Sequence, residues 1–208
     1  MSARIDRVVT SGTFSLDGGT WAVDNNVWLI GNYREVLVVD AAHDPDAIVA
    51  GVGGRRVVAV LCTHGHNDHI NVAPELAERL YAPVLLHPAD EPLWRMTHPD
   101  ARYRSLADTA RISVAGIDIE ILHTPGHSPG SVCLYLPELN ALCTGDTLFA
   151  GGPGATGRSY SDFGTIIDSI RDRLLTLPDE TTVHTGHGED TTIGAEKPSL
   201  ADWIARGH

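Results

Sequence analysis

One stretch of seven residues constrains the chain more than any other: Thr63-His64-Gly65-His66-Asn67-Asp68-His69. It gathers three imidazoles and a carboxylate, side chains that bind transition metals at neutral pH. The apolar run at residues 57–62 predicts a buried strand before it, and helical spacing of apolar residues follows at 72–80. Open α/β folds place their sites at such strand-to-helix turns. The stretch therefore predicts a metal centre; the alternative is a polar turn whose histidines cap the helix.

Three further donors lie in turn contexts far along the chain: His127, Asp146 and His187. Each directly follows a glycine, which lets the backbone turn sharply and direct a side chain into a cleft. Any one of them alone is typical of a turn or cap residue. Together with the first stretch, they predict a single cluster of metal ligands.

Alternation of apolar residues and turn signals predict the remaining elements. Strands are predicted at residues 4–10, 21–23, 27–30, 35–40, 57–62, 84–86, 117–122, 131–136, 141–144 and 181–183, with a hairpin turn at 24–26. Helices are predicted at 44–53 and 72–80, from Ser161 or Asp162 to Leu177, and from Pro198 with Leu200, Trp203 and Ile204 facing inward. Residues 87–111 are predicted to form a loop and short helix that serve as a rim or lid. This order, without a linker, predicts an α/β fold of two sheets with outer helices, as a single domain over residues 1–208.

Composition narrows the class of protein. The net charge of −12 and the lack of a basic cluster argue against a nucleic-acid partner. No apolar run approaches the ~18 residues of a membrane span, and the first residues have no apolar signal region, so we expect a cytoplasmic protein without a membrane partner. Cys62, Cys133 and Cys143 lie in apolar runs and are expected to be reduced, buried thiols.

The donor pattern resembles that of the metallo-β-lactamase fold superfamily, and the likeness covers nearly the whole chain. It implies an αββα sandwich with two mixed sheets, outer helices and two metals at one edge of the sheets. Position by position, the resemblance implies a first metal on His64, His66 and His127, and a second on Asp68, His69 and His187. Asp146 would bridge the two. Asp40 matches an aspartate that orients the first loop in this family; the alternative is a plain strand-end turn.

Within the superfamily, residues 124–131, 145–149 and 185–188 look most like the glyoxalase II (hydroxyacylglutathione hydrolase) group of thioester hydrolases. The loop at 151–163 is similar to theirs and to that of persulfide dioxygenases. Two departures stand out. The chain ends at residue 208, without the C-terminal helical region that grips glutathione in the larger enzymes, so the identity of the thiol stays open. Asn71 stands where glycine is common.

The resemblance implies two divalent cations, with Zn²⁺ expected and iron or manganese as alternatives. Two such ions make hydroxide available at neutral pH for attack on a carbonyl. We expect the substrate to be a thioester of a low-molecular-weight thiol, with Asp68 also orienting the nucleophile. Arg158 is the candidate for holding an anionic group of the substrate, unless it pairs with Asp162. Tyr160 and His87 are weaker candidates for the wall of the site.

Other functions stay open from the sequence. A persulfide dioxygenase would use a single non-haem iron with open positions for O₂. A lactonase is a further alternative. A non-enzymatic binding module would be expected to have lost ligands, and none of the seven is lost. The oligomeric state is open, with a homodimer among the options.

Overall fold

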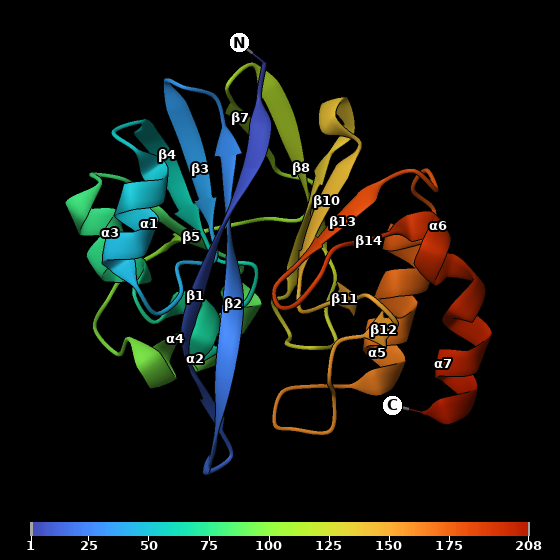
Figure 1. Cartoon of the computed structure of the whole chain (residues 1–208). Coiled ribbons are helices and arrows are strands. Elements are labelled where there is room, and N and C mark those ends of the chain that lie inside the picture. The colour runs from blue at the N-terminus through green and yellow to red at the C-terminus, as the bar shows by residue number, and fades with distance from the viewer. Residues whose placement is uncertain (1, 208) are drawn as a thin grey trace.

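The computed structural model describes residues 2–207 and arranges them in four layers, with two β-sheets face to face between two groups of helices (Figure 1). The first sheet has the order β1-β2-β3-β4-β5-β6, with β1 (Arg4–Leu16), β2 (Gly19–Gly31), β3 (Glu35–Val39), β4 (Arg56–Leu61), β5 (Val84–Leu86) and β6 (Arg104–Ser105). The second has the order β14-β13-β10-β9-β8-β7, with β7 (Arg111–Val114), β8 (Ile117–His123), β9 (Val132–Leu136), β10 (Ala141–Gly145), β13 (Thr182–Thr185) and β14 (Thr191–Thr192). Both sheets mix parallel and antiparallel pairs. The αββα sandwich predicted from the sequence is confirmed.

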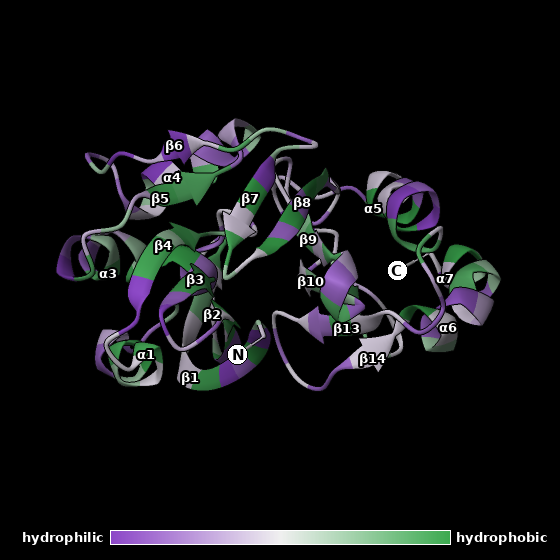
Figure 2. Ribbon diagram, turned by 90° about the horizontal axis from the view of Figure 1, so that it is seen from above, coloured by the Kyte–Doolittle hydropathy of each residue, from purple (hydrophilic) through white to green (hydrophobic). Residues whose placement is uncertain are grey.

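Helices lie outside both sheets (Figure 2). On the side of the first sheet are α1 (Pro45–Val52), α2 (Asn67–Ile70), α3 (Ala73–Arg79) and α4 (Glu91–Thr97). On the side of the second are α5 (Phe163–Ser169), which continues as a π-helical turn over Ile170–Leu174, α6 (Ile193–Glu196) and α7 (Leu200–Arg206). Strands β11 (Leu148–Phe149) and β12 (Gly152–Pro153) form a small separate hairpin. Within residues 2–207, no helix has the length and hydrophobicity needed to cross a membrane.

Three apolar clusters hold the layers together. Strand β3 shows how they are divided: Val36 and Val38 join the cluster beneath the helices of the first sheet, whereas Leu37 joins the cluster between the sheets. Residues 36–39 of β3 are apolar at every position, which is typical of a strand that is buried on both faces. The third cluster packs α5 and α7 onto the second sheet, and it includes Ile166 and Trp203.

The prediction of a hairpin turn at residues 24–26 is wrong. These residues lie inside β2, and the turn is at Asp17 and Gly18, where both φ angles are positive as a two-residue hairpin loop requires. Polar residues between two apolar runs are typical of a turn, but Asn25 and Asn26 are buried and form hydrogen bonds with segments distant in sequence. The β1–β2 hairpin consequently extends well beyond the rest of its sheet (Figure 1).

Smaller differences come from short elements. Strands β7 and β14 and helix α6 were not predicted, because two to four residues carry too little periodicity. In α7 Trp203 is buried as predicted, but Ile204 is 50 % exposed, so its predicted inward orientation is wrong. Trp203 and the partly buried Leu200 are the α7 residues that pack against the third cluster.

The carboxyl ends of several strands meet at one edge of the sandwich. In the first sheet β3 and β4 are parallel, and Asp40 and Thr63 follow them. In the second sheet β8, β10 and β13 run in the same direction, which brings the turns after them to the same edge. The backbone N–H of Val132 donates to the Thr63 carbonyl across the two sheets at 2.8 Å. The predicted donors therefore meet where the sheets are joined.

Candidate metal centre

The structure brings all seven predicted donors together, although they come from both sheets. Their ligand atoms form three groups in which all atoms lie within 4.8 Å of one another. These groups are His64-His66-His127, Asp68-His69-His187 and His64-His69-Asp146. The donors of the 63–69 stretch are almost fully buried, because the strand-to-helix turn places them beneath the β1–β2 hairpin.

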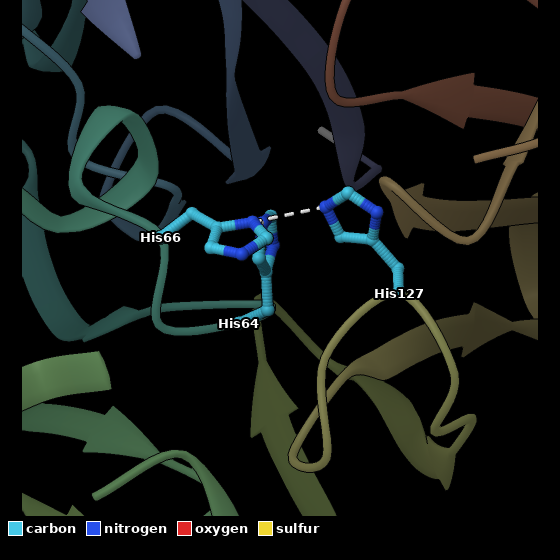
Figure 3. A group of neighbouring side chains, drawn as sticks. All are labelled: His64, His66 and His127. Atoms are coloured by element: carbon cyan, nitrogen blue, oxygen red, sulfur yellow. Dashed lines mark hydrogen bonds between the residues drawn. The ribbon is translucent and has the colours of Figure 1, made fainter. Parts of the chain in front are cut away.

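The first group consists of three imidazoles (Figure 3). Nδ1 of His66 lies 3.0 Å from Nε2 of His64 and 3.0 Å from Nε2 of His127. Imidazole nitrogens approach this closely when they share a proton or surround a cation. One proton cannot satisfy three nitrogens, whereas three neutral imidazoles are a common set of ligands for a divalent metal.

The second group contains Asp68, His69 and His187. Nε2 of His69 lies 3.2 Å from Nε2 of His187, and Oδ2 of Asp68 lies 3.3 Å from the latter. Asp146 lies between the two groups: its Oδ1 is 3.4 Å from Nε2 of His69, and its Oδ2 is 3.6 Å from Nε2 of His127. Oδ1 of Asp146 is buried and has no hydrogen-bond partner. A carboxylate so placed fits a ligand shared by two cations.

Hydrogen bonds behind the rings fix which nitrogen faces the centre. Nδ1 of His127 lies 2.8 Å from the carbonyl of Ala155, and Nδ1 of His187 lies 2.7 Å from that of Asp24. A carbonyl only accepts, so both Nδ1 atoms carry a proton, and the Nε2 atoms are the ones that face the centre and can bind a metal.

Asp40 likewise fixes which nitrogen of His64 and His69, in the loop at residues 63–69, faces the centre. One carboxylate oxygen accepts the backbone N–H of Thr63 at 2.7 Å, and the other accepts the Thr63 hydroxyl at 2.8 Å and Nδ1 of His69 at 2.9 Å. The Thr63 hydroxyl gives its only proton to Asp40, so at 3.1 Å it accepts from Nδ1 of His64. The Nε2 atoms of His64 and His69 are thereby left free to bind a metal.

Replacing Asp40 by asparagine should weaken metal binding about 10–100-fold, the usual effect of losing a partner behind a ligand. Asparagine has one accepting oxygen, so it cannot accept the Thr63 backbone N–H on one side and the protons of the Thr63 hydroxyl and His69 on the other. Its amide would donate to Nδ1 of His69 or oppose the Thr63 N–H. Titration of the metal-free variant with Zn²⁺ in competition with a chromophoric chelator measures the change. Wild-type affinity for both ions would contradict this role of Asp40.

The charges of the centre shift the pKa values of its members in opposite directions. Burial opposes the charged form of His187, but the Asp146 and Asp68 carboxylates raise its pKa to about 10. Burial likewise opposes ionisation of Asp146, but His69 and His187 hold its pKa well below the usual range. The metal-free protein thus carries protons that an incoming metal must displace. Metal affinity should fall as the pH is lowered, and a metal titration in weakly buffered solution should show the released protons.

Asp90 is a member of the site that the sequence did not reveal. It is fully buried in the 87–111 segment, and its carboxylate accepts the backbone N–H of Gly65 (2.7 Å), the Ser128 hydroxyl (2.7 Å) and the backbone N–H of Gly130 (2.5 Å). Gly65 lies between two ligands of the first loop, and Ser128 follows His127. Asp90 therefore connects the two loops that carry the first group. An aspartate two residues before a proline is typical of a helix cap, so nothing in the sequence distinguishes it.

A cavity of about 160 Å³ opens onto the donors. Besides the donors, its walls are Phe14 and Val23 from the β1–β2 hairpin and Ala155 and Arg158 from the loop before α5. The ring of Phe14 contacts that of His66 edge-on, with centroids 5.1 Å apart. The cavity thus combines an apolar wall with one cation.

Arg158 is held over aromatic rings. Its guanidinium carbon lies 3.8 Å from the ring centroid of Trp21, and Asp17 accepts the backbone N–H of Ser159 at 2.9 Å. Asp162 instead caps α5 through the backbone N–H of Thr165, so the alternative pairing of Arg158 with Asp162 is not what the structure shows.

Two other predicted wall residues lie elsewhere. Tyr160 is 47 % exposed, and the ring of His87 stacks on that of His123 with centroids 4.1 Å apart. Neither is among the residues that line the cavity. His184 lies 2.8 Å from Asp190 and is not among the donor groups.

Comparison with known proteins agrees with this geometry. The profile of the Metallo-beta-lactamase superfamily matches residues 20–187. The chain belongs to the metallo-β-lactamase superfamily. Members of this superfamily are mostly hydrolases.

Individual relatives show which members of the superfamily are similar to this chain. The chain is 35 % identical over 184 residues to the hydroxyacylglutathione hydrolase GloC of Haemophilus influenzae, covering 80 % of this chain and 86 % of the relative. The structure of TTHA1623 in a di-iron-bound form is 33 % identical, with a TM-score of 0.76, covering 84 % of this chain and 93 % of the other. ETHE1 from Myxococcus xanthus is 26 % identical, with a TM-score of 0.72 and coverage of 93 % and 85 %. A relative with two irons supports a dinuclear site in this chain.

Proposed function

We propose that this member of the metallo-β-lactamase superfamily is a dinuclear metal hydrolase that cleaves a thioester of a low-molecular-weight thiol, with Zn²⁺ as its metal. The observation that carries the proposal is the convergence of two three-residue donor groups on the shared carboxylate of Asp146. The likeness to GloC supports the choice of a thioester.

When bound, the metal pair supplies an acidified water as nucleophile and a Lewis acid for the carbonyl oxygen. The residues of the chain provide the rest. Asp68 presents Oδ2 toward His187, and its neighbour Asn25 holds that oxygen at 3.1 Å, so the carboxylate is placed to orient the attacking water. Phe14 and Val23 offer an apolar wall to the acyl group, which limits the water that reaches it.

Hydrolysis assays test the proposal directly. The purified chain, loaded separately with Zn²⁺, Fe²⁺ and Mn²⁺, is supplied with S-lactoylglutathione and with acyl thioesters of other small thiols. We expect thiol release with kcat/KM of about 10⁴ M⁻¹ s⁻¹ or more for the preferred thioester. If no thioester is hydrolysed while two metal ions per chain are bound, the proposal is wrong.

A second candidate is persulfide dioxygenation by a single iron, which the similarity of the 151–163 loop suggests. The likeness to ETHE1 from Myxococcus xanthus supports this alternative. Oxygen uptake with a thiol persulfide, measured on the iron-loaded protein, distinguishes the two reactions. Lactone hydrolysis is followed in the same set of assays.

Arg158→Ala should raise KM for an anionic thioester about 10–100-fold and leave kcat nearly unchanged. A charge-assisted hydrogen bond contributes about 1.5–3 kcal/mol, and Arg158 lines the cavity without belonging to the donor groups. Arg158→Lys should restore part of the loss, because it keeps the charge without the planar fork. A neutral ester of the same substrate is the control. An equal loss with the neutral substrate would contradict this role of Arg158.

A further inference from the structure

A chain of hydrogen bonds leads from Asp68 to three residues outside the ligand pattern. Asn25 lies next to Asp68, His43 lies beyond Asn25, and Asn71 lies beyond His43. The four side chains come from β2, from the turn before α1, and from both ends of α2. Asn25 is fully buried, and His43 is half-buried.

The donor and acceptor of each hydrogen bond follow from the contact between Asn71 and the backbone of His43. Oδ1 of Asn71 accepts the backbone N–H of His43 at 2.8 Å, so the amide nitrogen of Asn71 is the atom that faces Nδ1 of His43 at 2.9 Å. Nδ1 of His43 therefore accepts, and the proton of a neutral ring is on Nε2. Nε2 donates to Oδ1 of Asn25 at 2.8 Å. The amide nitrogen of Asn25 is then directed at Oδ2 of Asp68 and donates to it at 3.1 Å.

Two features show that the arrangement is specifically built. His43 has φ = +59°, a left-handed conformation that is unfavourable for a non-glycine residue. Such a conformation persists only where the surrounding contacts hold it in place. A Cβ at Gly12 would lie 2.2 Å from Nδ1 of His43, so β1 has no side chain where the ring packs. Burial also lowers the pKa of His43, which keeps the ring neutral, as the directions above require.

We infer that His43 and Asn71 are positioning residues for the second metal position, which hold the Asp68 carboxylate through Asn25 with Oδ2 turned toward His69 and His187. Without the hydrogen bonds of His43 and Asn71, the Asn25 amide could rotate by 180° and direct its carbonyl oxygen at the Asp68 carboxylate. The repulsion would turn Asp68 away from its two imidazole partners. The first metal position does not depend on these hydrogen bonds, because its donors are held by Asp90 and by the carbonyl of Ala155. The inference rests on the two-metal site of the proposed function but not on its substrate.

The test is metal binding by the full-length protein after its metal has been removed with a chelator. Co²⁺ is added stepwise, the visible absorption is recorded, and the bound metal is counted by plasma emission. The variants are His43→Gly, which suits the left-handed backbone and removes the ring, and Asn71→Ala, which keeps the helical backbone. The control is His98→Ala: Nε2 of His98 lies 2.8 Å from the carbonyl of Ile70, beside Asn71, without reaching Asp68.

Both variants should bind the second equivalent of Co²⁺ about 10–100-fold more weakly and the first equivalent with unchanged affinity. The double variant should lose no more than either single variant, because the residues act as one chain. In the wild type, nitrogen-15 NMR should show His43 as the Nε2-protonated tautomer, and Asn71→Ala should alter this signal. His98→Ala should change neither measurement.

Three outcomes would overturn the inference: a second equivalent bound at wild-type affinity in both variants, an equal loss for both equivalents, or the same loss in His98→Ala. A wild-type protein that binds only one Co²⁺ would overturn the two-metal site itself. Failure of thioester hydrolysis alone would refute the proposed substrate and leave the metal titration intact.

Discussion

Asp146→Asn protein is expected to lose about a thousandfold or more of its hydrolase activity and to bind its second metal ion poorly. Asp146 is the only carboxylate within reach of both donor groups among residues 2–207, with oxygens 3.4 Å from His69 and 3.6 Å from His127. Lewis-acid catalysis by a metal contributes several kcal/mol, and about 1.4 kcal/mol corresponds to a factor of ten in rate. An amide keeps the shape but removes the charge that two cations would share.

The measurement combines the rate of thiol release with the number of metal ions per chain. Asp190→Asn is a matched control, because that carboxylate also pairs with a histidine, His184 at 2.8 Å, but lies outside the donor groups. It should keep wild-type activity. If Asp146→Asn binds two metal ions with wild-type affinity, Asp146 does not bridge them.

Asp90→Ala is expected to have the largest effect on stability, about 3 kcal/mol or more. Three buried donors, from Gly65, Ser128 and Gly130, would lose their acceptor, and each unsatisfied buried group costs about 1–3 kcal/mol. The link between the two loops of the first donor group would be lost as well. Affinity for the first metal should therefore fall with stability. Urea unfolding of the metal-free and the metal-loaded protein measures both effects.

Asp44→Ala is the control for that experiment. The Asp44 carboxylate also accepts two backbone N–H groups, those of Asp46 and Ala47, but it is exposed at the start of α1. Loss of a helix cap typically costs about 1 kcal/mol. If Asp90→Ala costs no more than Asp44→Ala, the loops are held together by other contacts.

The sequence predicted the parts of the site that have local signals. The donors of residues 63–69 follow a strand directly, and Asp146 and His187 each follow a glycine at a strand end. Strand order then brings such turns to one edge of the sandwich. The family pattern supplied the pairing of donors that spacing alone left open.

The supporting residues could not be predicted in this way, because their partners are distant in sequence. Asn25 lies between apolar runs, as turn residues do, and its place inside β2 depends on Asp68 and His43. Asp90 is similar to a helix cap until Gly65 and Gly130 are placed around it. In the sequence, Asn71 stands out only because glycine is common at that position. Its contact with His43 exists only in the folded protein.

The order in which the donors occur along the chain bears on how the enzyme acquires its cofactors. His64, His66 and His127 meet once the two sheets pack against each other, whereas the second group stays incomplete until β13 pairs with β10 and brings His187 to it. The chain therefore contains the three imidazoles of the first group before synthesis has supplied His187, and the second group is completed only by the last strands.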